Sequence, residues 1–314
     1  MKKLHQEKIY TNPVNVLLFS VLCTLLWGSA FPCIKIGYGL FGLSTGDIPG
    51  KLVFAGIRFL AAGLIVLAIN LFQTKKLMRP SRSNIKGILL VSIFQSILEY
   101  IFFYISMSHT TGVKGSIIDA SGFFFVVILA HIFYKNDKLT FKKIAGCIIG
   151  FLGIIIINMN GLSASDFSFT FLGDGFMILA ALFFAIGSVI SKNVCQKADA
   201  AMVTGYQLGI GGLVLTIIGL SFGGSLKQIL LPGILLLIYM AFLSAIAFTL
   251  WTTLTKYNKI SKIAVYNFLT PVFGTLLSSL FLGENLFTWT NLFALLLVCI
   301  GIYVVNVVRK EPMN

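Results

Sequence analysis

Long apolar runs follow one another along almost the whole chain, and short polar links separate them. A helix needs about 20 predominantly apolar residues to cross a bilayer. We predict helices in these runs, because a helix satisfies its own backbone hydrogen bonds in lipid. The pattern therefore predicts an all-α membrane protein with ten transmembrane helices, at residues 14–37, 51–73, 86–107, 113–134, 142–160, 172–193, 200–222, 231–255, 260–282 and 287–308.

The second half of this pattern resembles the first. Residues 109–158 align without a gap with residues 257–306 and share eight identical positions. An earlier pair of segments, 54–69 and 203–218, aligns at almost the same shift. That alignment matches two glycines of each segment, Gly56 with Gly205 and Gly63 with Gly212.

Two repeats of five spans each, at residues 14–160 and 172–308, follow from this pattern. Because each repeat crosses the membrane an odd number of times, the second is inverted relative to the first. The loop charges agree, since the basic loop 135–143 aligns with 283–291, which has no lysine or arginine. Inverted repeats are how many transporters achieve alternating access.

The distribution of charge places the chain in a membrane. The chain is 57% hydrophobic and 11% charged, whereas soluble domains carry about 25% charged residues. With both termini inside, 19 of the 24 lysines and arginines lie on the inner side, and three, Lys51, Lys114 and Lys227, lie outside. This asymmetry follows the positive-inside rule. It predicts cytoplasmic termini in the cell (plasma) membrane, and lysine-rich loops without an organelle signal favour a bacterial one.

Several classes of function are disfavoured. The net charge of +14 is spread between apolar runs, so we expect the lipid bilayer as a partner and no nucleic acid. No H-E-x-x-H, G-x-x-x-x-G-K-[ST] or G-x-S-x-G pattern occurs. The five cysteines form no C-x-x-C pair. We therefore expect no enzymatic activity, no metal and no cofactor.

Four ionisable residues fall inside the predicted spans of the first half: Lys35, Arg58, Glu99 and Asp119. Ionisable groups in a membrane are costly and by default indicate function. All four map to the outer leaflet, on consecutive helices, and we predict one charged cluster that faces the interior of the bundle. The aligned positions of the second half are uncharged, with Gln207 at Arg58, Asn267 at Asp119 and Ala247 at Glu99.

Plainer roles stay open for these charges. Lys35 can extend to the membrane surface, and Arg58 can pair with Glu99 without touching a substrate. Pro32 and Pro271 interrupt two spans, a feature that often borders transporter sites. Polar aromatic residues within or near the spans are further candidates for lining a cavity: Trp27, Tyr206, Trp251 and Tyr266.

Three motifs resemble the EamA-type branch of the drug/metabolite transporter superfamily. They are LLWGSAFPCIKIG (25–37), FAGIRFLAAG (54–63) and FLGENLFTWTNLFALLLVCIGIYVVN (281–306). The resemblance implies ten helices, cytoplasmic tails, an inverted pseudo-twofold, a central cavity, and helices 5 and 10 at the periphery. Phe123 departs from the family pattern, which has proline there, and Glu99 and Asp119 are not general markers of the family.

The resemblance further implies that many members export amino acids or other small metabolites, several with the proton gradient. We therefore expect a secondary-active exporter of amino acids or similar small molecules, with protons as an optional coupling ion, acting as a monomer or homodimer. One alternative is a carrier of phosphorylated metabolites or nucleotide sugars, which would need several cations in its cavity. Another is a non-transporting membrane protein, either lipid flippase-like or a scaffold.

Overall fold

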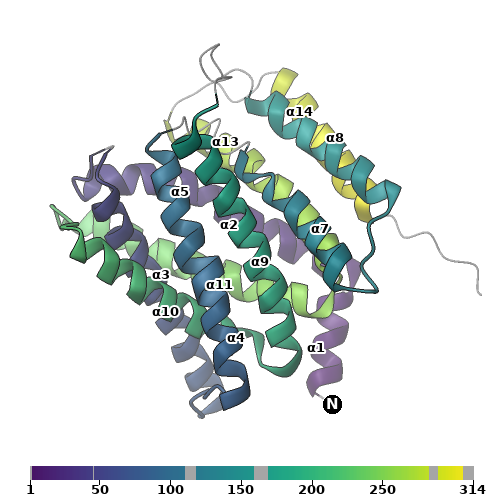
Figure 1. Ribbon diagram of the computed structural model, residues 1–314, viewed down its shortest axis with the longest axis horizontal. Helices are drawn as coiled ribbons and strands as arrows, with labels where there is room; N and C mark the ends of the chain where they lie inside the picture. The colour runs from purple at the N-terminus through teal and green to yellow at the C-terminus, as the bar shows by residue number, and fades with distance from the viewer. Residues whose placement is uncertain (1, 45, 110–117, 159–168, 283–288, 307–314) are drawn as a thin grey trace, which may run out of the picture.

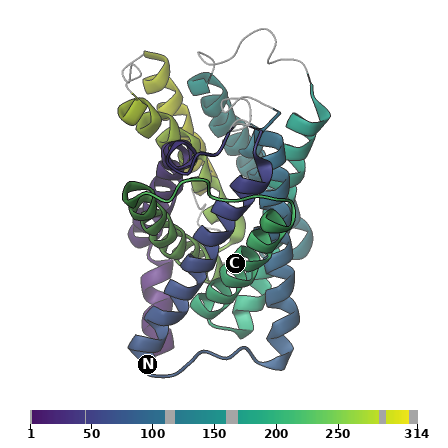
Figure 2. The ribbon, with the colours of Figure 1, turned by 90° about the vertical axis from the view of Figure 1, so that its left-hand side faces the viewer.

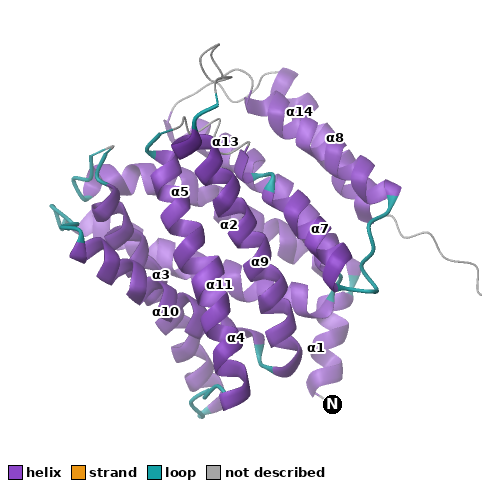
Figure 3. Ribbon diagram, viewed as in Figure 1, coloured by secondary structure: helices purple, strands orange, loops and turns teal. Residues whose placement is uncertain are grey.

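The computed structural model describes residues 2–44, 46–109, 118–158, 169–282 and 289–306. Helices and their connecting loops make up this part of the chain, and it contains no strand (Figure 3). The helices are α1 (Lys2–Thr11), α2 (Pro13–Leu40), α3 (Ile48–Thr74), α4 (Arg82–Ser92), η1 (Ile93–Leu98), α5 (Glu99–Met107), α7 (Gly122–Phe133), α8 (Phe141–Asn158), η4 (Phe171–Gly175), α9 (Phe176–Lys197), α10 (Ala200–Ser221), α11 (Leu231–Tyr257), α12 (Ile260–Ala264), η5 (Val265–Phe268), α13 (Leu269–Leu282) and α14 (Trp289–Asn306).

The prediction of an all-α membrane protein is confirmed. Among the described residues, six helical stretches are long and apolar enough to cross a membrane: Pro13–Leu40, Ile48–Thr74, Arg82–Met107, Phe171–Lys197, Ala200–Ser221 and Leu231–Tyr257. Gly122–Phe133 and Leu295–Asn306 are shorter apolar helices. The first five residues of the expected span 113–134 lie outside the described residues. The number of ten spans therefore stays a prediction.

Four of the expected spans are not uninterrupted α-helices. In span 113–134, residues 120–121 form a turn before α7. Span 86–107 contains the π-helix η1, span 172–193 begins in the π-helix η4, and span 260–282 contains the 3₁₀ segment η5. The last break has a clear cause, because Pro271 lacks an N–H and its ring crowds the carbonyl of Asn267, four residues earlier. Pro32 does not break its helix, since α2 runs from Pro13 to Leu40.

The helices cross at different angles: in the side view several run from top to bottom, while the end of α2 points toward the viewer (Figure 2). The most extensive contact joins α3 to α10. At this contact a Cβ atom on Gly63 would lie 2.6 Å from the carbonyl oxygen of Gly205, and one on Gly212 would lie 2.7 Å from that of Gly56. The two backbones therefore touch, which is the packing that small residues permit between membrane helices.

A second close pair, α8 and α14, lies along one edge of the bundle (Figure 1). A Cβ atom on Gly146 would lie 2.7 Å from the carbonyl oxygen of Gly301, and one on Gly301 would lie 2.6 Å from that of Gly146. Gly146 of α8 and Gly205 of α10, each the first glycine of a G-x-x-x-G spacing, are thus used for contacts inside the chain.

The packing of α3 against α10 can be tested by substituting one glycine at the contact and, as a matched control, one glycine whose Cβ would meet no neighbour. Gly212→Ala forces a Cβ against the backbone of α3, and such overpacking costs about 1–3 kcal/mol. Gly209→Ala, one turn away on the same helix, places its Cβ where nothing lies within 4 Å. We expect the melting temperature in detergent to fall for Gly212→Ala and to hold or rise for Gly209→Ala. Equal melting temperatures for the two variants would contradict the packing described.

Candidate functional site

A cavity of about 140 Å³ lies in the bundle and is lined by elements from both halves of the chain. Its volume is comparable to that of protein cavities of about 150 Å³ that accommodate benzene. Seven aromatic side chains line it: Trp27, Phe31, Tyr100, Phe103, Phe123, Phe184 and Phe248. The polar lining comprises Arg58, Glu99, Asp119, Asn267 and Thr270. A small apolar cavity with a few convergent polar groups is the usual form of a ligand site.

Arg58 of α3 lines the cavity and is buried, with only 3% of its surface exposed. Its Nε donates a hydrogen bond to Ser244 Oγ of α11 over 2.8 Å. Its guanidinium carbon lies 4.9 Å from the centre of the Phe59 ring, a cation–π distance. These contacts fix the guanidinium. Nε uses one of the five N–H donors of the group, so the guanidinium can also donate to a ligand in the cavity.

Glu99 is the first residue of α5 and follows the π-helix η1 directly. Its Oε2 atom is buried and has no hydrogen-bond partner among the described residues. A buried carboxylate oxygen without a partner is costly. A proton or an N–H group of a ligand would remove that cost. Glu99 is therefore the cavity group best suited to exchange a proton or to bind an amine.

Asp119 lines the same cavity from the helical residues that precede α7, and Asn267 lines it from η5. Thr270 donates from Oγ1 to Asn267 Oδ1 over 3.3 Å. The lining therefore combines one guanidinium, two carboxyl groups and one carboxamide. Groups of both charge signs in one small aromatic cavity can bind a molecule that carries an amine and a carboxylate together.

Comparison with known proteins identifies the class of protein that holds this cavity. The model of the EamA-like transporter family matches residues 14–159 and again residues 171–307. The chain belongs to the EamA-like transporter family. It is therefore a multi-pass membrane transporter of the drug/metabolite transporter superfamily, as the resemblance implied.

Individual relatives agree with this assignment. The transporter is 28% identical to the uncharacterized transporter YvbV of Bacillus subtilis, over 94% of this chain and 92% of that one. It is 28% identical to the uncharacterized inner membrane transporter YedA of Escherichia coli, over 91% of this chain and 92% of the relative. It is also 26% identical to a WAT1-related chloroplastic protein of Arabidopsis thaliana, of which it spans 66%. A solved crystal structure with 16% identity superposes with a TM-score of 0.73 and covers 94% of this chain and 98% of the other.

Five of the ten site residues predicted from the sequence line the cavity: Trp27, Arg58, Glu99, Asp119 and Asn267. The structure places the other five elsewhere. Lys35 is exposed, and Tyr206 donates from its hydroxyl to the Met78 carbonyl over 2.9 Å. Trp251 packs behind Trp27 at a ring distance of 5.0 Å. Gln207 is fully buried and bonds to Gln95 and Ser96, and Tyr266 is buried in η5.

Sequence reasoning missed Ser244, the hydrogen-bond partner of Arg58. The repeat did hold a signal for it. Ser244 lies 148 positions after Ser96, and Gln207 lies 149 positions after Arg58. Gln207 Nε2 lies 3.4 Å from Ser96 Oγ. The two polar pairs thus occupy matching places in the two halves. Among the described residues, no group of three histidine, cysteine, aspartate or glutamate side chains could hold a metal ion.

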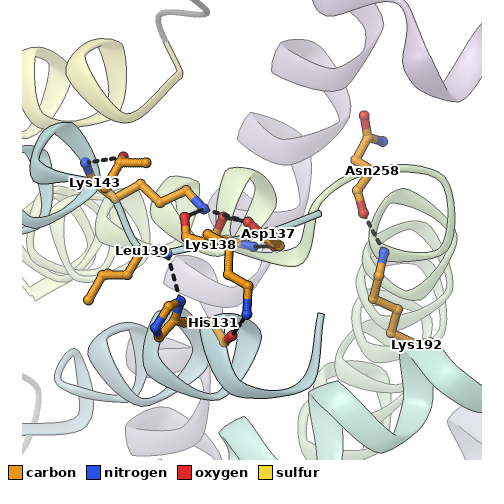
Figure 4. Close-up of polar contacts among 9 residues, drawn as sticks. His131, Asp137, Lys138, Leu139, Lys143, Lys192 and Asn258 are labelled. Atoms are coloured by element: carbon orange, nitrogen blue, oxygen red, sulfur yellow. Dashed lines mark hydrogen bonds and ion pairs between the residues drawn. The ribbon is translucent and has the colours of Figure 1, made fainter. Parts of the chain in front are cut away.

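A polar network joins the two halves of the transporter at one end of the bundle (Figure 4). Its centre is Asp137, a buried residue of the loop between α7 and α8. The carboxylate accepts hydrogen bonds from Ser261 N at 3.1 Å, from the Ser261 hydroxyl and from Lys143 Nζ at 2.5 Å. Because Ser261 lies in α12, Asp137 fastens the loop after α7 to the start of that helix.

Neighbouring contacts hold the same loop in place. Lys138 Nζ donates to the His131 carbonyl over 3.1 Å, and Leu139 N donates to His131 Nδ1 over 3.1 Å (Figure 4). The Tyr134 hydroxyl donates to the Val189 carbonyl of α9 over 3.0 Å. Lys192 of α9 donates to the Asn258 carbonyl at the end of α11. The dipole of α11 also stabilises a cation at this C-terminal end. Of these contacts, the bond from Tyr134 to Val189 joins the first half to the second.

The Asp137 contacts make the stability of the transporter depend on pH. Burial alone would raise the pKa of Asp137, but the hydrogen bonds from Lys143 and Ser261 and the lysine charge hold it below its usual 3.8. Since the folded-state pKa is lowered, the contribution to stability is present above the unfolded pKa and is lost as pH falls through the folded one. We expect the melting temperature of the natural chain to decrease as the pH drops below about 4.

We expect Asp137→Asn to lower the melting temperature at pH 7, since breaking a buried pair costs about 3–5 kcal/mol.

Asp47→Asn is the matched control for Asp137→Asn. Asp47 pairs with the exposed Lys227 at 3.4 Å, and exposed pairs contribute about 0–1 kcal/mol. Asparagine also preserves the cap that Asp47 makes on Gly50 N. If Asp137→Asn melts at the temperature of the natural chain at pH 7, the network does not stabilise the clasped state.

Proposed function

We propose that this transporter is a secondary-active exporter of small amino acids or similar metabolites, which works by alternating access and exchanges its substrate for protons at Glu99. The observation that carries the proposal is the cavity lining, where Arg58, Glu99 and Asp119 meet. A zwitterionic ligand finds a cation for its carboxylate and carboxyl groups for its ammonium. The volume of about 140 Å³ suits a small molecule rather than a nucleotide.

Alternating access needs two related halves, and the helix contacts support an inverted repeat. The helix α2 packs against α13, and α9 packs against α7. In the same way α2 packs against α11 as α9 packs against α5. These are the paired contacts that a twofold relation between residues 14–160 and 172–308 requires.

The residue contacts between the repeats are also reciprocal. Gly56 meets Gly212 and Gly63 meets Gly205, although the alignment equates Gly56 with Gly205 and Gly63 with Gly212. Equivalent glycines therefore exchange partners across α3 and α10, as residues do around a twofold axis. Ten spans, in two inverted sets of five, is the architecture that we propose.

The bias of lysine and arginine between links supports cytoplasmic termini and a bacterial plasma membrane. The Asp137 network then lies at the cytoplasmic end, because Asn258 Nδ2 bonds to the carbonyl of Tyr10 near the N-terminus. A clasp at that end is expected of a state closed toward the cytoplasm.

The alternatives receive less support from the cavity. A carrier of phosphorylated metabolites or nucleotide sugars needs several cations, whereas Arg58 is the one cation among the described residues that line the cavity, and Lys35 lies outside it. A lipid flippase-like protein or a scaffold would not need a fixed guanidinium beside a carboxyl group without a partner. The oligomeric state, monomer or homodimer, does not enter the proposal.

The direct test is counterflow of labelled amino acids in proteoliposomes. We expect saturable exchange of small amino acids, and faster net uptake into vesicles whose lumen is more acidic than the medium, because protons leave as substrate enters. No exchange of any amino acid by folded protein would contradict the proposal.

Glu99→Gln separates the role of Glu99 from general damage. A hydrogen bond to a charged group contributes about 1.5–3 kcal/mol, so we expect the affinity for an amino acid to fall about 10- to 100-fold and its pH dependence to disappear. The control is Asp199→Asn, which removes a carboxylate outside the cavity and keeps the N-cap of α10. A Glu99→Gln variant with unchanged affinity and unchanged pH profile would exclude Glu99 as the coupling group.

A further inference from the structure

The helix that carries Glu99 into the cavity contains one π turn. α4 ends at Ser92, the π-helix η1 spans Ile93–Leu98, and α5 begins at Glu99. The N–H of Glu99 bonds to the carbonyl of Phe94, five residues earlier. A π turn of this kind accommodates one extra residue in a helix and often occurs at functional sites.

The alignment of the two halves shows the same extra residue in the first half. α4 begins at Arg82 and α11 at Leu231, 149 positions apart, the same shift that relates Gly56 to Gly205. Beyond the π-helix the shift is 148, as Phe125 and Phe273 show. The first half thus has one residue more than the second, and α11 runs as an uninterrupted α-helix from Leu231 to Tyr257.

One residue changes the direction of every side chain that follows. Successive residues of an α-helix are about 100° apart around the axis. With the π turn, Glu99 takes the direction that Leu98 would have in a continuous helix that starts at Arg82. Without the π turn, Leu98 would face the cavity and Glu99 would be turned away from it.

Four buried polar side chains hold the π turn from outside the cavity. Gln95 Nε2 donates to Ser188 Oγ of α9 over 3.1 Å. Gln207 Nε2 of α10 donates to Gln95 Oε1 over 3.1 Å and lies 3.4 Å from Ser96 Oγ. All four side chains are 5% exposed or less. A shift of η1 to an α-helix would break these bonds in an apolar surrounding, where an unmade hydrogen bond is costly.

Two glycines let the neighbouring helices approach η1 closely. A Cβ on Gly187 of α9 would lie 3.1 Å from the backbone nitrogen of Gln95, and one on Gly211 of α10 would lie 3.0 Å from Ser96 Oγ. The contact surface of α9 and α10 is therefore shaped to the π turn itself.

We propose that Gln207 and Ser188 are positioning residues, which hold η1 in its π form through Gln95 and thereby direct Glu99 into the cavity. The consequence for transport rests on the proposed function of Glu99, but the placement of the side chain does not. Gln207, predicted from the sequence as a cavity residue, then acts on the site through the helix of the other half.

The test compares cysteines at positions 98 and 99, in a chain whose five natural cysteines are replaced by alanine. A membrane-impermeant thiol reagent should label Glu99→Cys, whose side chain faces the cavity, and not Leu98→Cys. Adding Gln207→Leu should shift the ratio of the two labelling rates toward position 98 by about tenfold or more, as expected when a buried hydrogen bond no longer favours the π turn. Ser188→Ala should shift it in the same direction.

Thr204→Val is the matched control for Gln207→Leu. Thr204 is a fully buried residue one turn away on α10, and its hydroxyl has no partner among the described residues. Its substitution should leave the labelling ratio unchanged. An unchanged ratio in folded Gln207→Leu and Ser188→Ala proteins overturns the proposal, as does equal labelling of positions 98 and 99 without either change.

The labelling test and the transport test can fail independently of each other. If the ratio shifts as expected but the natural chain exchanges no amino acid, the positioning of Glu99 stands and the proposed function falls. If the natural chain exchanges amino acids and Gln207→Leu keeps both its labelling ratio and its pH profile, the positioning role falls and the proposed function stands.

Discussion

Hydrocarbon offers no hydrogen-bond partner, so a polar group inside this bundle is costly unless the protein, or what the protein binds, satisfies it. Arg58 Nε bonds to Ser244, and Gln207 Nε2 bonds to Gln95. Several buried oxygens of the described residues have no partner, among them Gln207 Oε1, the Thr204 hydroxyl and Glu99 Oε2, and of these three only Glu99 belongs to a residue that lines the cavity. A proton or a ligand in the cavity would supply the partner that Glu99 Oε2 lacks.

The two halves differ in the polar residues that they place at aligned positions, and the charged ones of the first half line the cavity. Arg58 and Asp119 are charged, while their aligned residues Gln207 and Asn267 are neutral. Gln207 is buried against Gln95 and Ser96 and does not line the cavity, whereas Arg58 lines it. In the proposals above, these aligned positions therefore have a binding role in one half and a positioning role in the other.

Apolar run lengths were sufficient to predict an all-α membrane protein, because a bilayer imposes them directly. Ionisable residues are costly inside those runs. This cost made Arg58, Glu99 and Asp119 predictable as cavity residues, and all three line the cavity. The direction of a side chain around its helix was not predictable in the same way. Lys35 and Tyr206 are as conspicuous in the sequence as Arg58, yet one is exposed and the other bonds to Met78 away from the cavity. The π turn shifts directions by one residue, and only the change of repeat shift from 149 to 148 hinted at it.

The central claim is that substrate occupies the cavity between the two halves and reaches it from either side of the membrane. Ala181→Cys tests it most directly, since Ala181 lines the cavity from α9 and is 1% exposed. In a chain otherwise free of cysteine, an impermeant thiol reagent should label this position from each face of sealed, oriented vesicles. An exchanged amino acid should slow the labelling in proportion to its occupancy. Labelling from one face only, or labelling that a transported amino acid does not slow, would contradict the account.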